Sequence, residues 1–389
     1  MDTKAATVQT APEKQLLSVS ANWIISFRDD LLWIIGSVIS SYVFLLFYLL
    51  AGVPALILIL VWVLLFDGPH IFGTVSRTFL DPEMRVRCRK ILYSSLVLFV
   101  IGPAMAVLPG LIAPFTPGHP WLVFLSENSS VTFIFLASMW AYHHIAMQHY
   151  GFMMLYKRKN DDLHAADNSA DRFFLLAMLG YPFVRYMLRV PEARDMWPIV
   201  PGVGISNVME IAALAVAIAA AIAFLWRHFQ KVIHGQAVDL AKLLFLGAVI
   251  PMHWIVLLSS LPPRVMVPIL TVSHNIQYHR LIWLHNRNKY RGECARTQYG
   301  PAALISRNFF IYYLLGILFA VYRLPNAFSD SDLLIGFLWG FSLVHYYLDG
   351  KIWRVRENPE LKFYLRLVPT SPGSQGSAVL TGMPETKLN

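Results

Sequence analysis

Long apolar runs dominate the sequence and limit what the chain can fold into. A helix rises about 1.5 Å per residue, so roughly 20 apolar residues cross the hydrocarbon core of a bilayer. Ten runs approach or reach this length, although several contain Pro or Gly and the fifth and ninth are short. They cover residues 31–51, 54–73, 91–109, 130–153, 173–187, 208–226, 243–261, 265–284, 309–321 and 333–348. The sequence therefore predicts an all-α fold, a polytopic transmembrane helical bundle of about ten spans.

The composition excludes most other classes of protein. Charged residues make up 14% of the 389 residues, whereas soluble domains carry about 25%. A soluble enzyme of this length is not expected with so few charges. The chain is also too apolar for a disordered protein and lacks the heptads of a coiled coil. Its two cysteines, Cys88 and Cys294, lie in Arg-rich stretches and indicate a reducing compartment without a structural disulfide.

The ends of the chain differ from its centre. Residues 1–29 are polar and lack the apolar core and cleavage site of a signal peptide, so we expect a cytoplasmic N-terminal segment. Residues 30–356 form the predicted transmembrane domain. Residues 357–389 form a cytoplasmic tail that is Ser-, Gly-, Pro- and Thr-rich from residue 369, and we expect this tail to be largely disordered.

Lysine and arginine in the loops predict the orientation of the spans. Clusters of these residues follow the second, fourth, sixth, eighth and tenth spans, whereas residues 110–128 contain none. Even-numbered spans should therefore end in the cytoplasm, where both termini also lie. Arg185, Arg189 and Arg194 follow the fifth run, so that segment can instead be interfacial or re-entrant. The net charge of +9 has the same origin, and nothing indicates nucleic-acid binding. We expect a multi-pass membrane protein, in the inner membrane if the source is bacterial.

Thirteen histidines are unusual in so apolar a chain. An ionisable side chain inside a bilayer is costly, and is therefore a functional candidate. Most of these residues fall near the predicted cytoplasmic ends of even-numbered spans, with His274 deeper in the eighth span and His253 in the middle of the seventh. These histidines, although scattered over the sequence, therefore lie at one depth in the bilayer. Imidazoles and carboxylates from several helices at one depth are what a metal site requires, so the sequence predicts such a site. Its candidate ligands are His70, His143, His144, His149, His253, His274, His279, His345, Asp349 and Asp67.

Alternatives to metal binding remain open at each position. His253 can be a buried imidazole bonded to a backbone carbonyl, and ion pairs or hydrogen bonds between helices can explain Asp67 and Asp349. Each aspartate lies three or four residues from a histidine, so it can be a ligand or the acceptor that orients the imidazole. His119, His164, His228 and His234 lie in loops or beside basic residues and are expected at the interface.

Several imidazoles with carboxylates and open positions are typical of oxygen-activating non-haem iron. The chain resembles integral-membrane, histidine-rich iron enzymes, namely membrane fatty-acid desaturases and hydroxylases and the Brp/Blh family of carotene-cleaving dioxygenases. Isolated histidines on several spans, and the Asp-x-x-His element formed by Asp67 and His70, carry this resemblance. It implies an O2-dependent oxidoreductase with one or two iron ions, a lipid or isoprenoid substrate and a cytoplasmic electron donor. Another transition metal also suits these ligands.

Two other functions remain possible on the sequence. A membrane cytochrome needs two facing imidazoles for its haem, which His253 and His274 can supply. A proton- or metal-coupled transporter uses intramembrane Asp and His residues as relays, although such proteins commonly have two related halves. The sequence shows no repeat of that kind.

Overall fold

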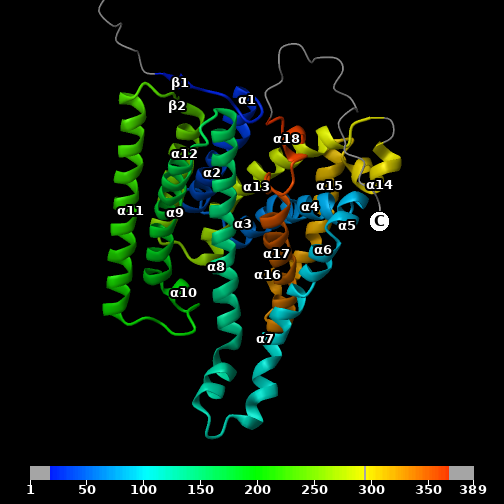
Figure 1. Ribbon diagram of the computed structural model, residues 1–389. Coiled ribbons are helices and arrows are strands. Elements are labelled where there is room, and N and C mark those ends of the chain that lie inside the picture. The colour runs from blue at the N-terminus through cyan, green and yellow to red at the C-terminus, as the bar shows by residue number, and fades with distance from the viewer. Residues whose placement is uncertain (1–17, 293–294, 368–389) are drawn as a thin grey trace, which may run out of the picture.

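The computed structural model describes residues 18–292 and 295–367, and within them the chain is almost entirely helical (Figure 1). The exception is a parallel pair of two-residue strands, β1 (Val19–Ser20) and β2 (Val238–Asp239). The prediction of an all-α bundle is confirmed for this part of the chain.

The helices follow the order of the predicted spans. The first three predicted spans correspond to series of short helices: α1 (Phe27–Asp29), η1 (Asp30–Ile35) and α2 (Val38–Leu49); α3 (Ala55–Trp62), η2 (Val63–Asp67) and α4 (Gly68–Thr78); and, after α5 (Pro82–Arg87), α6 (Arg89–Ser95), α7 (Leu98–Ile112) and η3 (Ala113–Phe115). The next are α8 (Pro120–Lys159), α9 (Ala165–Arg189), α10 (Pro191–Arg194), α11 (Val203–Ile233), α12 (Leu240–Leu258) and α13 (Pro263–Lys289). The chain ends with α14 (Ala295–Ile305), α15 (Phe309–Ala320), η4 (Val321–Arg323), α16 (Leu324–Phe328), α17 (Asp332–Ile352) and α18 (Leu361–Tyr364).

Six of these helices or helix series are long and apolar enough to cross a membrane. They are Phe27–Leu49, Ala55–Thr78, Arg89–Phe115, Pro120–Lys159, Val203–Ile233 and Leu240–Leu258, and the bent pair formed by α14 and α15–η4 makes a seventh if it is counted as one span. The other predicted spans lie in α9, α13 and α17, which are not in this set. The described residues therefore fit a multi-pass membrane protein with six or seven helices of this kind.

The helix that carries His70 begins at a local change of helical pitch. The backbone N–H of Gly68 donates to the carbonyl of Val63, five residues earlier, as in a π-helical turn. Such turns are rare and occur often at functional sites. Here the π-helical segment η2 leads directly into α4, so it sets the direction in which the side chains of α4 point.

Glycines allow the helices beside the site to pack at backbone contact. A Cβ atom added to Gly102 of α7 would lie 2.4 Å from the carbonyl oxygen of Gly336 of α17. A Cβ atom on Gly68 of α4 would lie 2.2 Å from the Cβ of Ala320 in α15. Small residues at such crossings are typical of membrane helix packing. These contacts set the positions of α17, which carries His345, and of α4, which carries His70.

The described ends of the chain lie at the same end of the bundle. β1, α14 and α18 are found there, whereas α10 and the α7–α8 connection lie at the other end (Figure 1). Leu361, Leu365 and Leu367 are buried, so the predicted C-terminal tail is packed as far as residue 367. The rest of that tail lies outside the described residues. Ile24, from the predicted N-terminal segment, is also buried.

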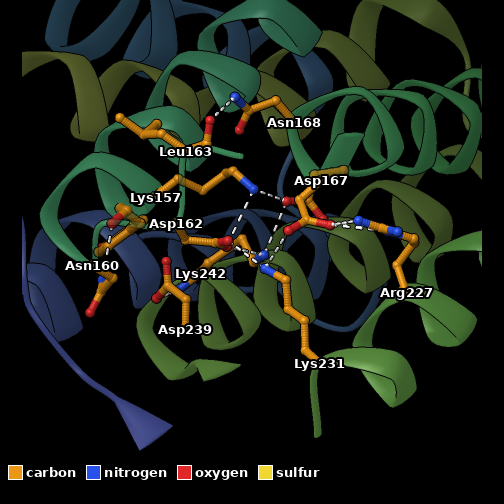
Figure 2. Close-up of polar contacts among 12 residues, drawn as sticks. Lys157, Asn160, Asp162, Leu163, Asp167, Asn168, Arg227, Lys231, Asp239 and Lys242 are labelled. Carbon is orange, nitrogen blue, oxygen red and sulfur yellow. Dashed lines mark hydrogen bonds and ion pairs between the residues drawn. The ribbon is translucent and has the colours of Figure 1, made fainter. Parts of the chain in front are cut away.

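A buried network of charges joins the ends of four helices. Asp162, which follows α8, accepts from Nζ of Lys242 at 2.9 Å and of Lys157 at 3.3 Å, and it also pairs with Lys231 (Figure 2). Asp171 of α9 pairs with Lys242 at 3.0 Å. Lys157 and Lys242 are fully buried, and a buried charge must be paired to be tolerated. The network therefore connects α8, α9, α11 and α12.

Two arginines that complicated the topology prediction are also paired. Arg189 of α9 lies 2.6 Å from Glu210 of α11, and Arg185 pairs with the same carboxylate. α9 is one continuous helix of 25 residues, longer than the predicted fifth run. The charges of these two arginines are therefore paired with a carboxylate on the neighbouring helix.

Candidate metal centre

Three histidines from three separate helices converge in the interior of the bundle. His70 lies on α4, His144 on α8 and His345 on α17, and one ring nitrogen of each lies within 4.8 Å of the other two. All three side chains are buried. The sequence predicted these three residues as ligands, and the structure brings them together.

Two further predicted ligands, both on α13, lie beside this group. The ring centroid of His274 is 4.8 Å from that of His70 and 5.2 Å from that of His144. The ring of His279 is 6.3 Å from that of His70. The five imidazoles, His70, His144, His274, His279 and His345, are called the histidine cluster below.

Every member of the histidine cluster has a buried ring nitrogen without a hydrogen-bond partner. These atoms are Nδ1 and Nε2 of His70, Nε2 of His144, Nδ1 of His274, Nε2 of His279 and Nε2 of His345. Buried polar atoms are nearly always hydrogen-bonded, because burying such an atom without a partner costs free energy. The unpartnered atoms of His70, His144 and His345 belong to rings that each place one nitrogen within 4.8 Å of the other two. This arrangement matches the donor set of a metal site, since neutral imidazole suits iron, copper, zinc and nickel.

A second polar layer lies directly behind the histidine cluster. Thr74 donates to Oδ1 of Asp349 at 2.7 Å, and Tyr278 donates to the same oxygen at 2.8 Å. The two hydroxyl oxygens are 2.6 Å apart. Oγ1 of Thr74 also lies 2.7 Å from Nδ1 of His345. Asp349, predicted as a ligand or as an orienting acceptor, therefore connects to His345 through Thr74, a contact that suits the orienting role.

These contacts favour one tautomer of His345. With the single hydroxyl proton of Thr74 donated to Asp349, Oγ1 accepts the hydrogen bond from Nδ1–H of His345. Nε2 of His345 then carries the lone pair, and this is the unpartnered nitrogen of the ring. A histidine that donates its other N–H to an oriented acceptor is typical of metal-binding sites.

The two layers follow a simple spacing in the sequence. Residues four apart on a helix share a face, and each orienting residue lies four positions after a histidine. The pairs are His70 with Thr74, His274 with Tyr278, and His345 with Asp349. On α8, Gln148 follows His144 by four and donates to the backbone carbonyl of His274 at 2.8 Å. Thr74 and Tyr278 were not among the predicted residues. Polar side chains four positions after a histidine are the signal in the sequence that could have identified them.

Two predicted ligands form a separate pair. Nε2 of His149 lies 3.1 Å from Nε2 of His253, and Nδ1 of His253 lies 3.1 Å from the hydroxyl of Tyr142. Tyr142 donates to the carbonyl of Leu179 at 2.7 Å, so His253 donates to Tyr142 and accepts from His149. The partners of His253 are thus two side chains of α8, His149 and Tyr142, and not the backbone carbonyl considered from the sequence. The ring of His149 is 6.4 Å from that of His274, which places the pair at the edge of the histidine cluster.

The structure separates two predicted ligands from the site. Oδ2 of Asp67 lies 2.7 Å from Nη1 of Arg323 in an ion pair, so this carboxylate is engaged by a cation. His143 is exposed on the surface of α8, because adjacent helical residues point about 100° apart. The donor set that remains is therefore made of imidazoles alone, without a carboxylate among the converging atoms.

Comparisons with known proteins add no assignment. No protein-family model matches the chain, and neither a curated protein nor a solved structure matches it. The resemblance to carotene dioxygenases and desaturases therefore has no support beyond the residues quoted for it.

Proposed function

We propose that the protein is an integral-membrane, metal-dependent oxidoreductase that uses O2 to oxidise a lipid or another apolar substrate. The observation that carries this proposal is the set of unpartnered ring nitrogens of the buried histidine cluster. His70, His144 and His345 would hold the metal, with His274 as a fourth ligand. We propose non-haem iron, because imidazole nitrogens suit iron and four histidine ligands leave coordination positions free for O2.

The surroundings of the cluster support chemistry on an apolar molecule. Bound iron would supply O2 activation. The chain itself supplies a buried site that excludes bulk water, and Thr74 and Asp349 hold His345 in one tautomer. If the reaction is a hydroxylation, one oxygen atom enters a C–H bond of the substrate and the other leaves as water. This consumes two electrons and two protons, for which we propose a reduced electron donor on the cytoplasmic side.

The positive loops support a defined orientation for this reaction. We propose ten spans with both termini in the cytoplasm, in the inner membrane if the source is bacterial. α9, α13 and α17 then cross the membrane although they are not among the helices that are apolar enough by composition. α13 and α17 carry residues of the histidine cluster and its second layer, and these polar side chains are buried inside the bundle, so they do not meet lipid.

Metal analysis of the purified full-length protein tests the proposal. We expect one or two iron ions per chain in the wild type, and less than about a tenth of that in His70→Ala, His144→Ala and His345→Ala. His143→Ala is the matched control, because it removes a neighbouring imidazole that is exposed and should leave the metal content unchanged. Anaerobic Fe(II) protein exposed to nitric oxide, a substitute for O2, should give the paramagnetic signal of an iron nitrosyl complex.

Three results would overturn the proposal. The first is folded wild-type protein that contains no metal and takes up none of the iron, copper or zinc offered to it. The second is equal metal loss in His143→Ala and His144→Ala, since that would point to nonspecific binding. An intense haem absorption band in the purified protein would favour the cytochrome considered from the sequence.

A further inference from the structure

An aromatic pocket of about 470 Å³ adjoins the histidine cluster. Its walls come from α1, η1, η2, α13 and α15, and they are formed mainly by Trp33, Phe66, Ile276, Trp283, Phe309 and Tyr313. The volume falls within the roughly 300–1,000 Å³ of small-molecule sites, which are usually apolar with a few placed polar groups. Residues from distant parts of the sequence, some of them more than 200 positions apart, thus form one cavity.

The inner wall of this pocket is a member of the histidine cluster. His279 lines the pocket, and its ring lies 6.3 Å from the ring of His70. Nδ1 of His279 lies 3.4 Å from the hydroxyl of Tyr312, whereas Nε2 has no partner although the residue is only 6% exposed. A molecule in the pocket would therefore reach the edge of the candidate metal centre.

The pocket also has an apolar opening and one charged pair. Trp33 is 44% exposed and Phe309 is 37% exposed, and both lie on helices apolar enough to meet lipid. Arg280 donates to Oδ1 of Asp29 through Nη2 at 2.7 Å and through Nε at 3.0 Å. The hydroxyl of Tyr313 is already bonded to the carbonyl of Leu65, so the Asp29–Arg280 pair supplies the exchangeable polar contacts.

We propose that this aromatic pocket binds the substrate of the metal centre, a long-chain amphiphile with one uncharged oxygen-bearing end. The oxygen, as in an alcohol or a carbonyl, hydrogen-bonds to the Asp29–Arg280 pair, and the chain runs along the aromatic walls to His279. An uncharged end is favoured because Asp29 already balances Arg280 and would repel a carboxylate. The role as substrate rests on the proposed function, whereas the binding of the amphiphile does not.

Photolabelling of the full-length protein in detergent micelles tests the binding. The probe is hexadecan-1-ol with a diazirine in the middle of its chain, and labelled peptides are identified by mass spectrometry. We expect adducts on Trp33, Ile276 or Trp283 that excess hexadecan-1-ol suppresses. Hexadecanoate should compete about fivefold more weakly, which corresponds to the ~1 kcal/mol at the upper end of the range for partly exposed charge interactions.

Two variants test the two halves of the proposal. Ile276→Trp fills the pocket and should reduce specific labelling at least about tenfold. Val267→Trp is the matched control, because Val267 is exposed on the same helix and does not line the pocket. Asp29→Asn removes the negative charge beside Arg280 and should bring hexadecanoate at least to parity with hexadecan-1-ol as a competitor.

The outcomes separate this inference from the proposed function. Labelling that persists in His70→Ala protein without metal supports the pocket and leaves it independent of the metal. Adducts spread over the lipid-facing helices and unchanged by Ile276→Trp would overturn the pocket, even if iron is present. A preference for hexadecanoate in the wild type, or an unchanged preference in Asp29→Asn, would overturn the assignment of the uncharged end.

Discussion

The hydroxyl oxygen of Thr74 lies 2.7 Å from Nδ1 of His345 and connects that histidine to Asp349. With the threonine proton donated to Asp349, the imidazole donates from Nδ1 and keeps the lone pair on Nε2. The contact joins α4 to α17, so one hydroxyl both orients a candidate ligand and holds two helices together.

Thr74→Val should weaken metal binding while the bundle stays folded. Valine has a similar shape but accepts no hydrogen bond, so His345 loses the partner that holds its tautomer, and the cost should be about 10–100-fold in metal affinity. Competitive titration with a chelator measures it. Thr74→Ser should retain most of the affinity. Thr271→Val on α13, where the hydroxyl donates to its own helix, should have no effect, and a similar loss there would contradict the orienting role of Thr74.

Asp67→Asn should lower stability and leave the metal content unchanged. The carboxylate of Asp67 pairs with Arg323 at 2.7 Å, and both side chains are largely buried. Removing one member of a buried ion pair leaves the other charge unpaired and costs about 3 kcal/mol. Thermal unfolding in detergent together with metal analysis separates the two effects.

The double variant Asp67→Asn/Arg323→Met is the control for this ion pair. It removes the unpaired guanidinium, so it should recover part of the stability lost in Asp67→Asn. Loss of metal in Asp67→Asn would instead restore Asp67 as a ligand, as the sequence suggested.

The sequence predicted the apolar helices and the histidines that converge in the bundle, because both depend on local properties. Apolar runs of membrane length appear in the sequence as such, and buried histidines in such runs have few explanations. His70, His144, His274 and His345 were therefore identified from one chain. It was harder to predict which face of each helix points into the bundle. His143 and His144 are equivalent by composition, and only the direction of the helix in the bundle decides which one is buried.

Partners from distant parts of the chain could not be predicted in the same way. Asp67 lies three residues from His70, which suggested a local pair, but Arg323 reaches it from α15–η4 and no spacing in the sequence indicates this contact. The buried lysines were interpreted as orienting charges in loops, and their pairing with Asp162 and Asp171 (Figure 2) depends on helix packing. The aromatic pocket likewise combines residues from five elements.

Asp162 should make the protein less stable in acid. Burial raises the pKa of this carboxyl, but the charges of Lys242, Lys231 and Lys157 outweigh this effect and hold the pKa well below its usual range. The unfolded chain has a pKa of about 3.9, so the contribution of Asp162 is fully present above pH ~4. As the pH falls further, the unfolded state binds the proton first, and stability is lost. Asp162→Asn should have a lower unfolding temperature at pH 7 and a flatter dependence below pH ~4. If the unfolding temperature of Asp162→Asn falls below pH ~4 as steeply as that of the wild type, other groups determine the loss of stability in acid.

Asp239 should have the opposite effect, in a different range of pH. Burial raises the pKa of its carboxyl to about 6, whereas the unfolded value is about 3.9. The folded state therefore retains the proton longer, and stability falls as the pH rises from ~4 to ~6. Two pKa units correspond to roughly 3 kcal/mol. Asp239→Asn removes this penalty, and it can still accept from the backbone N–H of Lys242, as Asp239 does at 3.0 Å.

Unfolding temperatures across pH distinguish the charge of Asp239 from its role as the N-terminal cap of α12. Asp239→Asn should exceed the wild type above pH ~6 and match it below pH ~4. Asp239→Ala also removes the charge but loses the cap, which costs about 1 kcal/mol, so it should lie below Asp239→Asn at every pH. A wild type that is as stable as Asp239→Asn at pH 7 would mean that the buried carboxylate carries no penalty, and that Lys242 compensates its charge in full.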